Sequence, residues 1–128
     1  MINDQEIQQL QNENNIEKAV EKTFLLGPSF IIVKLGSKGS ILFSKQEKYT
    51  CPAVTIKNVV DPTGAGDCFA GGFMGYLSST KDHSFDNMKK AVSYGTVMAS
   101  FCVQGFGTAS ILNLKEKLYL ERFNENFS

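Results

Sequence analysis

The stretch VVDPTGAGDCFAGGF, residues 59–73, predicts an extended segment that turns into a helix through closely spaced glycines. Its glycines and the small Ala65 let consecutive backbone N–H groups point at one spot, with the positive end of the helix dipole behind them. Such a helix start favours an anion or a developing oxyanion. Two carboxylates flank it, Asp61 and Asp67, and a carboxylate beside a phosphate is repulsive unless it handles a proton or a cation.

The two aspartates have different predicted roles. Asp67 falls in the first turn of the predicted helix, where the dipole keeps a carboxylate ionised and able to accept a proton, so it is a candidate general base. Asp61 precedes a turn fixed by Pro62 and is a candidate cation ligand or loop anchor. On local chemistry alone, a purely structural cap is an equally good interpretation. A P-loop is excluded because GxxxxGK[ST] is absent, and a dinucleotide fingerprint fails because Phe69 stands where glycine or alanine belongs.

Composition narrows the class of protein. The 128 residues, 42% of them hydrophobic, suffice for one domain with one core. Thirteen basic and thirteen acidic residues cancel, and no basic stripe indicates a nucleic-acid or membrane partner. Apolar runs are far shorter than the ~20 residues of a membrane span, and the polar N-terminus is no signal peptide. The three cysteines form no CxxC pair, so we expect reduced thiols in a soluble, cytoplasmic chain.

Periodicity and turn residues predict an α/β layered fold, in which strands are followed by helices. Alternation and turn signals indicate strands at 30–35, 40–43 and 53–60, the first two forming a hairpin. Helical spacing and capping residues indicate helices that start after Asn15, after the glycine turn, after Ser84 and after Asn113.

The predicted helices have apolar faces that we expect to point inward. These residues are Ile16, Ala19, Val20 and Phe24; Phe69, Phe73, Tyr76 and Leu77; Met88, Ala91, Val92, Gly95, Met98 and Ala99; and Leu114, Leu118 and Tyr119. Gly71, Gly72 and Gly75 interrupt the second helix, and each costs roughly 1 kcal/mol against alanine. They indicate a buried helix that another backbone approaches closely.

The motif DPTGAGDCFAGGF, residues 61–73, resembles the second signature of the ribokinase-like, or PfkB, family of carbohydrate and nucleoside kinases. In that family a D-[TP]-x-G-A-G-D stretch forms the anion hole and ends in the catalytic base. NDQE at 3–6 resembles the NxxE element, VKLGSKGS at 33–40 the strand and turn beside the nucleotide, and residues 91–107 the helix and loop that close the adenine pocket. The resemblance implies the C-terminal portion of a three-layer α/β/α ribokinase-like fold.

The resemblance also implies an activity, which is ATP-dependent transfer of the γ-phosphoryl group to an alcohol of a sugar or nucleoside. Asp67 would take the proton from the acceptor hydroxyl, while Gly64, Ala65 and Gly66 would stabilise negative charge on the transferring group. A carboxylate of low pKa suffices, because proton removal can come late and the main work is positioning and charge stabilisation.

The same resemblance assigns ligands. Asn3 and Glu6 would organise Mg²⁺ through water, although alone they read as an ordinary helix start. Asp61 and Thr63 match positions that contact a monovalent cation such as K⁺ in many members. The nucleotide base and ribose would lie beside Lys34, Gly36, Gly39, Thr96 and Gly107.

Cys68 has two interpretations, a reactive thiolate at a helix start or, more in keeping with its neighbours, a small packed residue.

Family members are much longer than this sequence, which opens at the NxxE element. We therefore expect residues 1–128 to form the C-terminal ATP-binding and catalytic portion of a kinase domain, without the acceptor-binding part and lid. Such a portion would pair with a complementary N-terminal piece or with a copy of itself. Two alternatives stay open: a nucleotide-binding module without catalysis, and an interaction remnant that binds nothing. Nothing in the glycine turn discriminates among alcohols.

Overall fold

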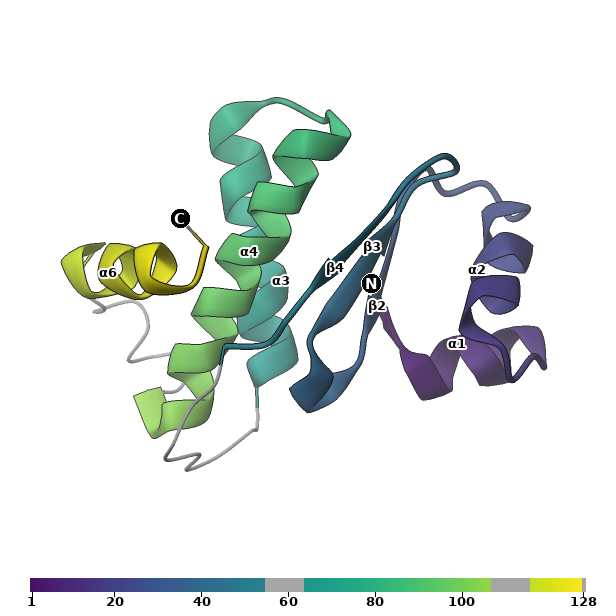
Figure 1. Cartoon of the computed structure of the whole chain (residues 1–128), viewed down its shortest axis with the longest axis horizontal. Helices are drawn as coiled ribbons and strands as arrows, with labels where there is room; N and C mark the ends of the chain where they lie inside the picture. The colour runs from purple at the N-terminus through teal and green to yellow at the C-terminus, as the bar shows by residue number, and fades with distance from the viewer. Residues whose placement is uncertain (55–63, 107–115, 128) are drawn as a thin grey trace. The chain divides into compact units, whose positions relative to one another are not determined.

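The structure is a computed structural model that describes residues 1–54, 64–106 and 116–127 (Figure 1). It divides into two compact units, Met1–Ala53 and Val54–Ser128, and each is described by itself. Within the described ranges, no helix combines the length and apolarity that crossing a bilayer requires.

The first unit is a mixed four-stranded sheet with two helices on one face (Figure 1). Its elements are β1 (Ile2–Asn3), α1 (Asp4–Gln11), α2 (Ile16–Phe24), β2 (Ile31–Lys34), β3 (Ser40–Phe43) and β4 (Lys48–Cys51). β1 runs parallel to β2, whereas β2 with β3 and β3 with β4 are antiparallel. The predicted hairpin around the 36–39 turn is confirmed, as is the helix that begins after Asn15, whose side chain accepts from the Lys18 N–H.

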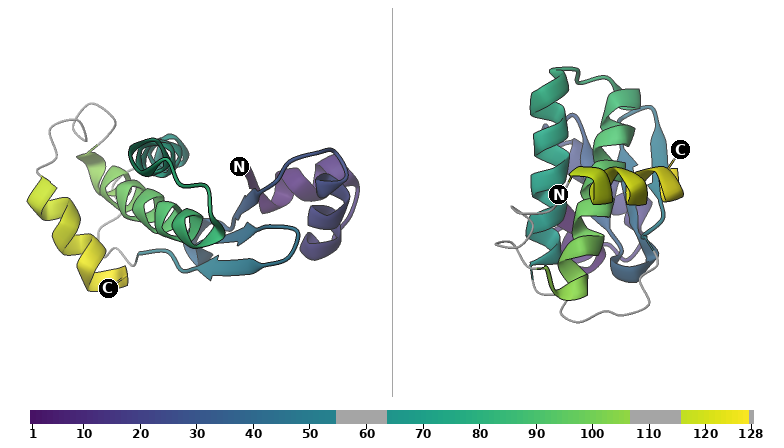
Figure 2. Two further views of the ribbon diagram at one scale, coloured as in Figure 1. Left: turned by 90° about the horizontal axis from the view of Figure 1, so that it is seen from above. Right: turned by 90° about the vertical axis from the view of Figure 1, so that its left-hand side faces the viewer.

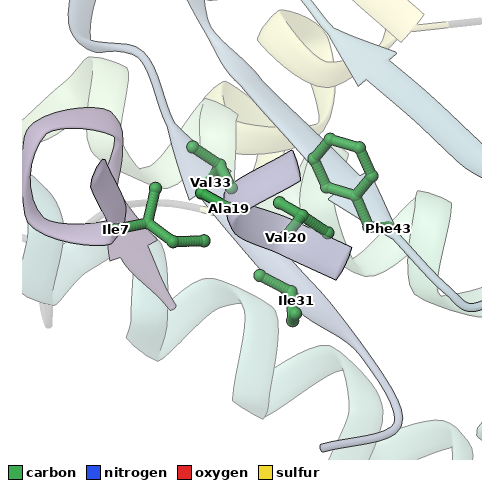
Figure 3. Close-up of a cluster of buried hydrophobic side chains, with 6 residues drawn as sticks. All are labelled: Ile7, Ala19, Val20, Ile31, Val33 and Phe43. Carbon is green, nitrogen blue, oxygen red and sulfur yellow. The ribbon is translucent and has the colours of Figure 1, made fainter. Parts of the chain in front are cut away.

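The core of the first unit lies between the sheet and its two helices. One cluster of buried side chains joins them: Ile7 from α1, Ala19 and Val20 from α2, and Ile31, Val33 and Phe43 from the strands (Figure 3). Ile32 and Leu42, a cross-strand pair that alternates with this cluster, are buried as well. Strands that are apolar on both faces are typical of sheets in layered α/β folds.

β4 was not predicted. Its sequence KYTC alternates exposed Lys48 and Thr50 with less exposed Tyr49 and buried Cys51, which is the period-2 signal of a half-buried strand. The stretch expected to be extended, 53–60, begins with Ala53 and Val54, which belong to no strand, and its other residues lie outside the described ranges.

The second unit is built on two long helices that run side by side in opposite directions (Figures 1 and 2). They are α3 (Ala65–Thr80) and α4 (Phe85–Phe101), and α4 continues into a π-helical turn, Cys102–Phe106. Ser84 caps α4 as predicted, since its hydroxyl accepts from the Asn87 N–H. The predicted inward residues of both helices are buried, apart from Tyr76, Met98 and Ala99, which are partly exposed.

The glycines of α3 divide between two environments. Gly72 lies against α4, where a Cβ would be 3.0 Å from the Gly95 Cα, so the predicted close approach of two backbones is confirmed there. Within the described part of the second unit, no atom outside the local backbone of α3 lies within 4 Å of a Cβ built on Gly71 or Gly75, so packing between α3 and α4 does not account for these two glycines.

Helix α6 (Glu116–Phe127) lies across α4 (Figure 2). The proposed cap Asn113 and the inward residue Leu114 lie outside the described ranges. Tyr119 packs against α4 as predicted, but the inward placement of Leu118 is wrong, because its side chain is 46% exposed. Arg122 and Phe123 make the contacts that sequence periodicity assigned to Leu118.

Candidate functional site

The glycine turn forms the start of α3. Gly64 is the N-cap residue, with a φ of +83° that side chains rarely tolerate, and among the described residues no side chain caps the helix. The first intrahelical bond runs from the Cys68 N–H to the Gly64 carbonyl, 2.9 Å. The N–H groups of Ala65, Gly66 and Asp67 precede it and have no partner within α3. This helix start therefore offers backbone donors and a positive dipole end to an anion.

Asp67 is exposed in the first turn of α3. Gly66 is exposed beside it, so the turn presents donors and a proton acceptor together.

Two buried thiols lie directly behind this turn. Cys68 of α3 and Cys102 at the end of α4 are 6% and 2% exposed. Burial raises the pKa of Cys68 to about 12, with further contributions from Cys102 and from the nearby Asp67 carboxylate. A Cβ on Gly64 would lie 3.7 Å from the Cys102 Sγ. Cys68 is therefore a packed, protonated residue, and its alternative as a reactive thiolate is not supported.

The NxxE element forms the start of α1. Asn3 Oδ1 accepts from the Glu6 N–H at 2.7 Å, and Glu6 Oε1 accepts from the Asn3 N–H at 3.2 Å, which is a complete capping box. Each side chain keeps a second polar atom, Nδ2 or Oε2, that the box does not use. The structural interpretation of the two residues is thus confirmed, and their role toward a metal stays a prediction.

Sheet register brings Asn3 next to the residues predicted for the nucleotide. Asn3 pairs with Lys34 in β2, and Lys34 pairs with Ser40 in β3. Residues directly opposite one another share a face, so these side chains form a polar row at the carboxyl ends of β1 and β2. Within the described part of the chain, the buried Ser40 Oγ has no hydrogen-bond partner, a feature that the sequence did not reveal.

The turn at 36–39 depends on its two glycines. Gly36 and Gly39 have φ of +63° and +98°, and the Leu35 N–H donates to the Gly39 carbonyl at 2.8 Å. A Cβ on Gly39 would overlap the Cys51 carbonyl oxygen and lie 2.8 Å from the Ala53 nitrogen. Both glycines are therefore structural turn formers, and this is compatible with a backbone contact to a ligand.

Of the remaining predicted site residues, one lies in α4 and three lie outside the described residues. Thr96 is buried in α4, where its hydroxyl donates to the Val92 carbonyl at 2.7 Å. Gly107, Asp61 and Thr63 lie outside the described residues. The described site residues fall in two units, with Asn3, Glu6 and the 34–39 segment in the first and the 64–67 turn and Thr96 in the second.

The side-chain oxygens of Asn3 and Glu6 fit a metal ion that is held mainly by other ligands. Among the described residues, no cluster of three or more His, Cys, Asp or Glu side chains is arranged to hold an ion. Asn and Glu oxygens nevertheless suit Mg²⁺, which keeps several of its waters and binds few protein groups. The exposed first turn of α3 fits phosphate, as described above. Asn3 and Glu6 therefore fit a role at a hydrated magnesium ion rather than direct enclosure of it.

Asn3 allows the cap to be separated from a ligand role. We expect Asn3→Ala to destabilise the chain by about 1 kcal/mol, because the Glu6 N–H loses its partner, whereas Asn3→Ser keeps a capping oxygen and nearly full stability. Urea denaturation of the two variants measures this difference. Equal destabilisation by both would show that the cap is not the structural role of Asn3.

The family model described as "pfkB family carbohydrate kinase" matches residues 1–115. A ribokinase from Arabidopsis thaliana is 37% identical over 111 residues, an alignment that covers 85% of this chain and 28% of the relative. A nucleoside kinase from Methanocaldococcus jannaschii is 33% identical over 96 residues, 75% of this chain and 30% of the relative. This chain thus spans about three tenths of the length of these curated relatives.

Comparison with solved structures agrees with the family match. The structure of Arabidopsis thaliana ribokinase complexed with ribose and ATP matches with a TM-score of 0.78 at 31% identity, covering 99% of this chain and 41% of that chain. The predicted α/β ribokinase-like fold is therefore confirmed.

Proposed function

The chain belongs to the pfkB family of carbohydrate kinases, and we propose that residues 1–128 form the nucleotide-binding and anion-hole portion of an ATP-dependent kinase acting on an alcohol of a sugar or nucleoside. The observation that carries the proposal is the start of α3. Backbone N–H groups without helical partners and the exposed Asp67 carboxylate stand there in the same turn. Ribokinase and nucleoside kinase relatives support this acceptor class.

In the proposed reaction, the residues of the glycine turn divide the work. The N–H groups of Ala65 and Gly66 donate to the oxygens of the transferring phosphoryl group, where negative charge increases. Asp67 accepts the proton of the acceptor hydroxyl as the bond to phosphorus forms. Gly64 permits the left-handed backbone that aims these donors.

The nucleotide and its ions are proposed to meet the other predicted residues. ATP supplies the γ-phosphoryl group, and Lys34, Gly36, Gly39, Thr96 and Gly107 are proposed to surround its base and ribose. Asn3 and Glu6 orient water on Mg²⁺, using the polar atoms that their capping box leaves available. Asp61 and Thr63 are proposed to bind a monovalent cation such as K⁺. The acceptor is proposed to be held mainly by protein outside these 128 residues.

Calorimetry and turnover test the proposal together. We expect the 128-residue chain to bind Mg-ATP, and the kinase expressed from its native gene to phosphorylate at least one member of a panel of sugars and nucleosides. Binding without turnover across the panel would leave a nucleotide-binding module as the function. The absence of nucleotide binding by both proteins would refute the proposal, and a Gly64→Val variant serves as the control for binding at the α3 turn.

A further inference from the structure

Helix α6 is attached to α4 by an aromatic cluster. The Tyr94 ring of α4 stacks on Tyr76 and on Phe123, each with centroids 4.4 Å apart, and on Tyr119 at 5.6 Å. The Tyr119 hydroxyl also donates to the Tyr94 carbonyl at 2.9 Å. The family match ends at residue 115, so the cluster joins α4 to a helix beyond it. The proposed reaction uses none of these contacts.

Arg122 connects α6 to the last turn of α4. Its guanidinium carbon lies 3.7 Å from the centroid of the buried Phe101 ring, and Nη1 donates to the Ser100 hydroxyl at 3.1 Å. That hydroxyl in turn donates to the Val97 carbonyl at 2.6 Å. Burial lowers the pKa of Arg122, which Glu125 opposes. A cation held over a desolvated ring is bound more strongly than one at an exposed site, so this contact restrains Phe101.

The restrained turn leads directly into the back of the glycine turn. Cys102 follows Phe101 and begins the π-helical turn, a geometry that occurs often at functional sites. Its Sγ is 3.7 Å from the position of a Cβ on Gly64, and it lies close enough to Cys68 to contribute to the raised pKa of that thiol. Arg122 is thus connected to the start of α3 through the Phe101 ring, the adjoining residue Cys102 and the approach of its Sγ to Gly64.

We propose that Arg122 is a positioning residue, which fixes the end of α4 so that Cys102 supports the Gly64 turn and holds the N–H groups of residues 65–67 in place. The inference rests on the proposed function for its effect on phosphoryl transfer, but not for its effect on the turn. Without the guanidinium, Phe101 loses this contact, and the turn that begins at Cys102 is held less firmly. Because a misplacement of about 1 Å can lower a rate by about 10²-fold, small movements there matter.

Amide hydrogen exchange of the 128-residue chain tests the structural part. In Arg122→Met, we expect the Cys68 N–H, which bonds to the Gly64 carbonyl, to exchange about tenfold faster. Arg122→Lys keeps a cation over the ring and should restore most of the protection. Tyr119→Phe is the matched control, because it removes a bond between α6 and α4 without touching Phe101. Unchanged exchange in Arg122→Met, or an equal increase in Tyr119→Phe, would overturn the inference.

Kinetics of the kinase expressed from its native gene test the consequence. We expect Arg122→Met to lower kcat about tenfold with KM for ATP within about twofold, because the donors to the transferring group are displaced while the 34–39 turn is not. Tyr119→Phe should leave kcat near its original value. A wild-type protein without turnover would refute the proposed function alone, since the exchange result stands by itself. Normal kcat in an active Arg122→Met enzyme would overturn the positioning role.

Discussion

Asp67→Asn is expected to lower phosphoryl transfer by at least ~10²-fold while nucleotide affinity changes little. Asparagine has nearly the same size as aspartate and keeps an oxygen at the exposed start of α3, so the backbone donors of the turn remain in place. It does not accept a proton from the acceptor hydroxyl. The effect therefore falls on kcat, and the measurement is kcat and KM of the kinase expressed from its native gene, with Mg-ATP affinity from calorimetry.

The chain offers a matched control for this variant in Asp86. This residue is also an exposed aspartate in the first turn of a helix, α4, where it pairs with Lys89 at 3.4 Å. Asp86→Asn removes the same favourable interaction with a helix dipole, worth about 0.3–1 kcal/mol, but lies at the opposite end of the α3–α4 pair (Figure 1). We expect normal turnover from it. Near-normal turnover from Asp67→Asn would exclude that residue as the general base.

Local signals in the sequence predict the starts of the helices well. Asn15 and Ser84 cap α2 and α4 as expected, because a capping side chain contacts only the next turn and so depends on nearby residues. The glycine turn is a signal of the same kind, since one positive φ at Gly64 and the following helix define it. Periodicity also identifies the buried faces of α3 and α4, because the helical repeat fixes which residues share a side.

Contacts between elements are where the sequence is least informative. Leu118 fits the apolar pattern of α6, yet Arg122 and Phe123 make the contacts with α4, because the aromatic cluster determines how the helix lies. The thiol pair of Cys68 and Cys102 joins residues far apart in the chain, and no local pattern predicts it. Asn3 and Glu6 show a different limit of sequence reasoning. The same short motif forms a capping box whether or not the two residues also act on a metal, so the motif alone does not distinguish the two roles.

Gly95→Val is expected to destabilise the second unit by about 2–3 kcal/mol. A Cβ at this position would lie 2.7 Å from the Phe69 carbonyl oxygen and 3.1 Å from the Phe69 ring, so α3 and α4 must separate to admit a side chain. The carbonyl belongs to the backbone of α3 and is not free to rotate away. Because Phe69 lies only two residues after Asp67 in α3, the same displacement would also disturb the predicted anion site.

The same substitution at Gly75 separates the packing effect from helix propensity. Gly75 lies in the interior of α3, and among the described residues no atom outside the local backbone of this helix is within 4 Å of a Cβ built on it. Valine there should change the free energy of unfolding by no more than about 0.5 kcal/mol, as at other open surface positions. Urea denaturation followed by tyrosine fluorescence measures both variants, because Tyr76, Tyr94 and Tyr119 all belong to the second unit. Equal stability of Gly95→Val and Gly75→Val would show that the helices do not depend on this close approach, and α3 would then be positioned by its other contacts.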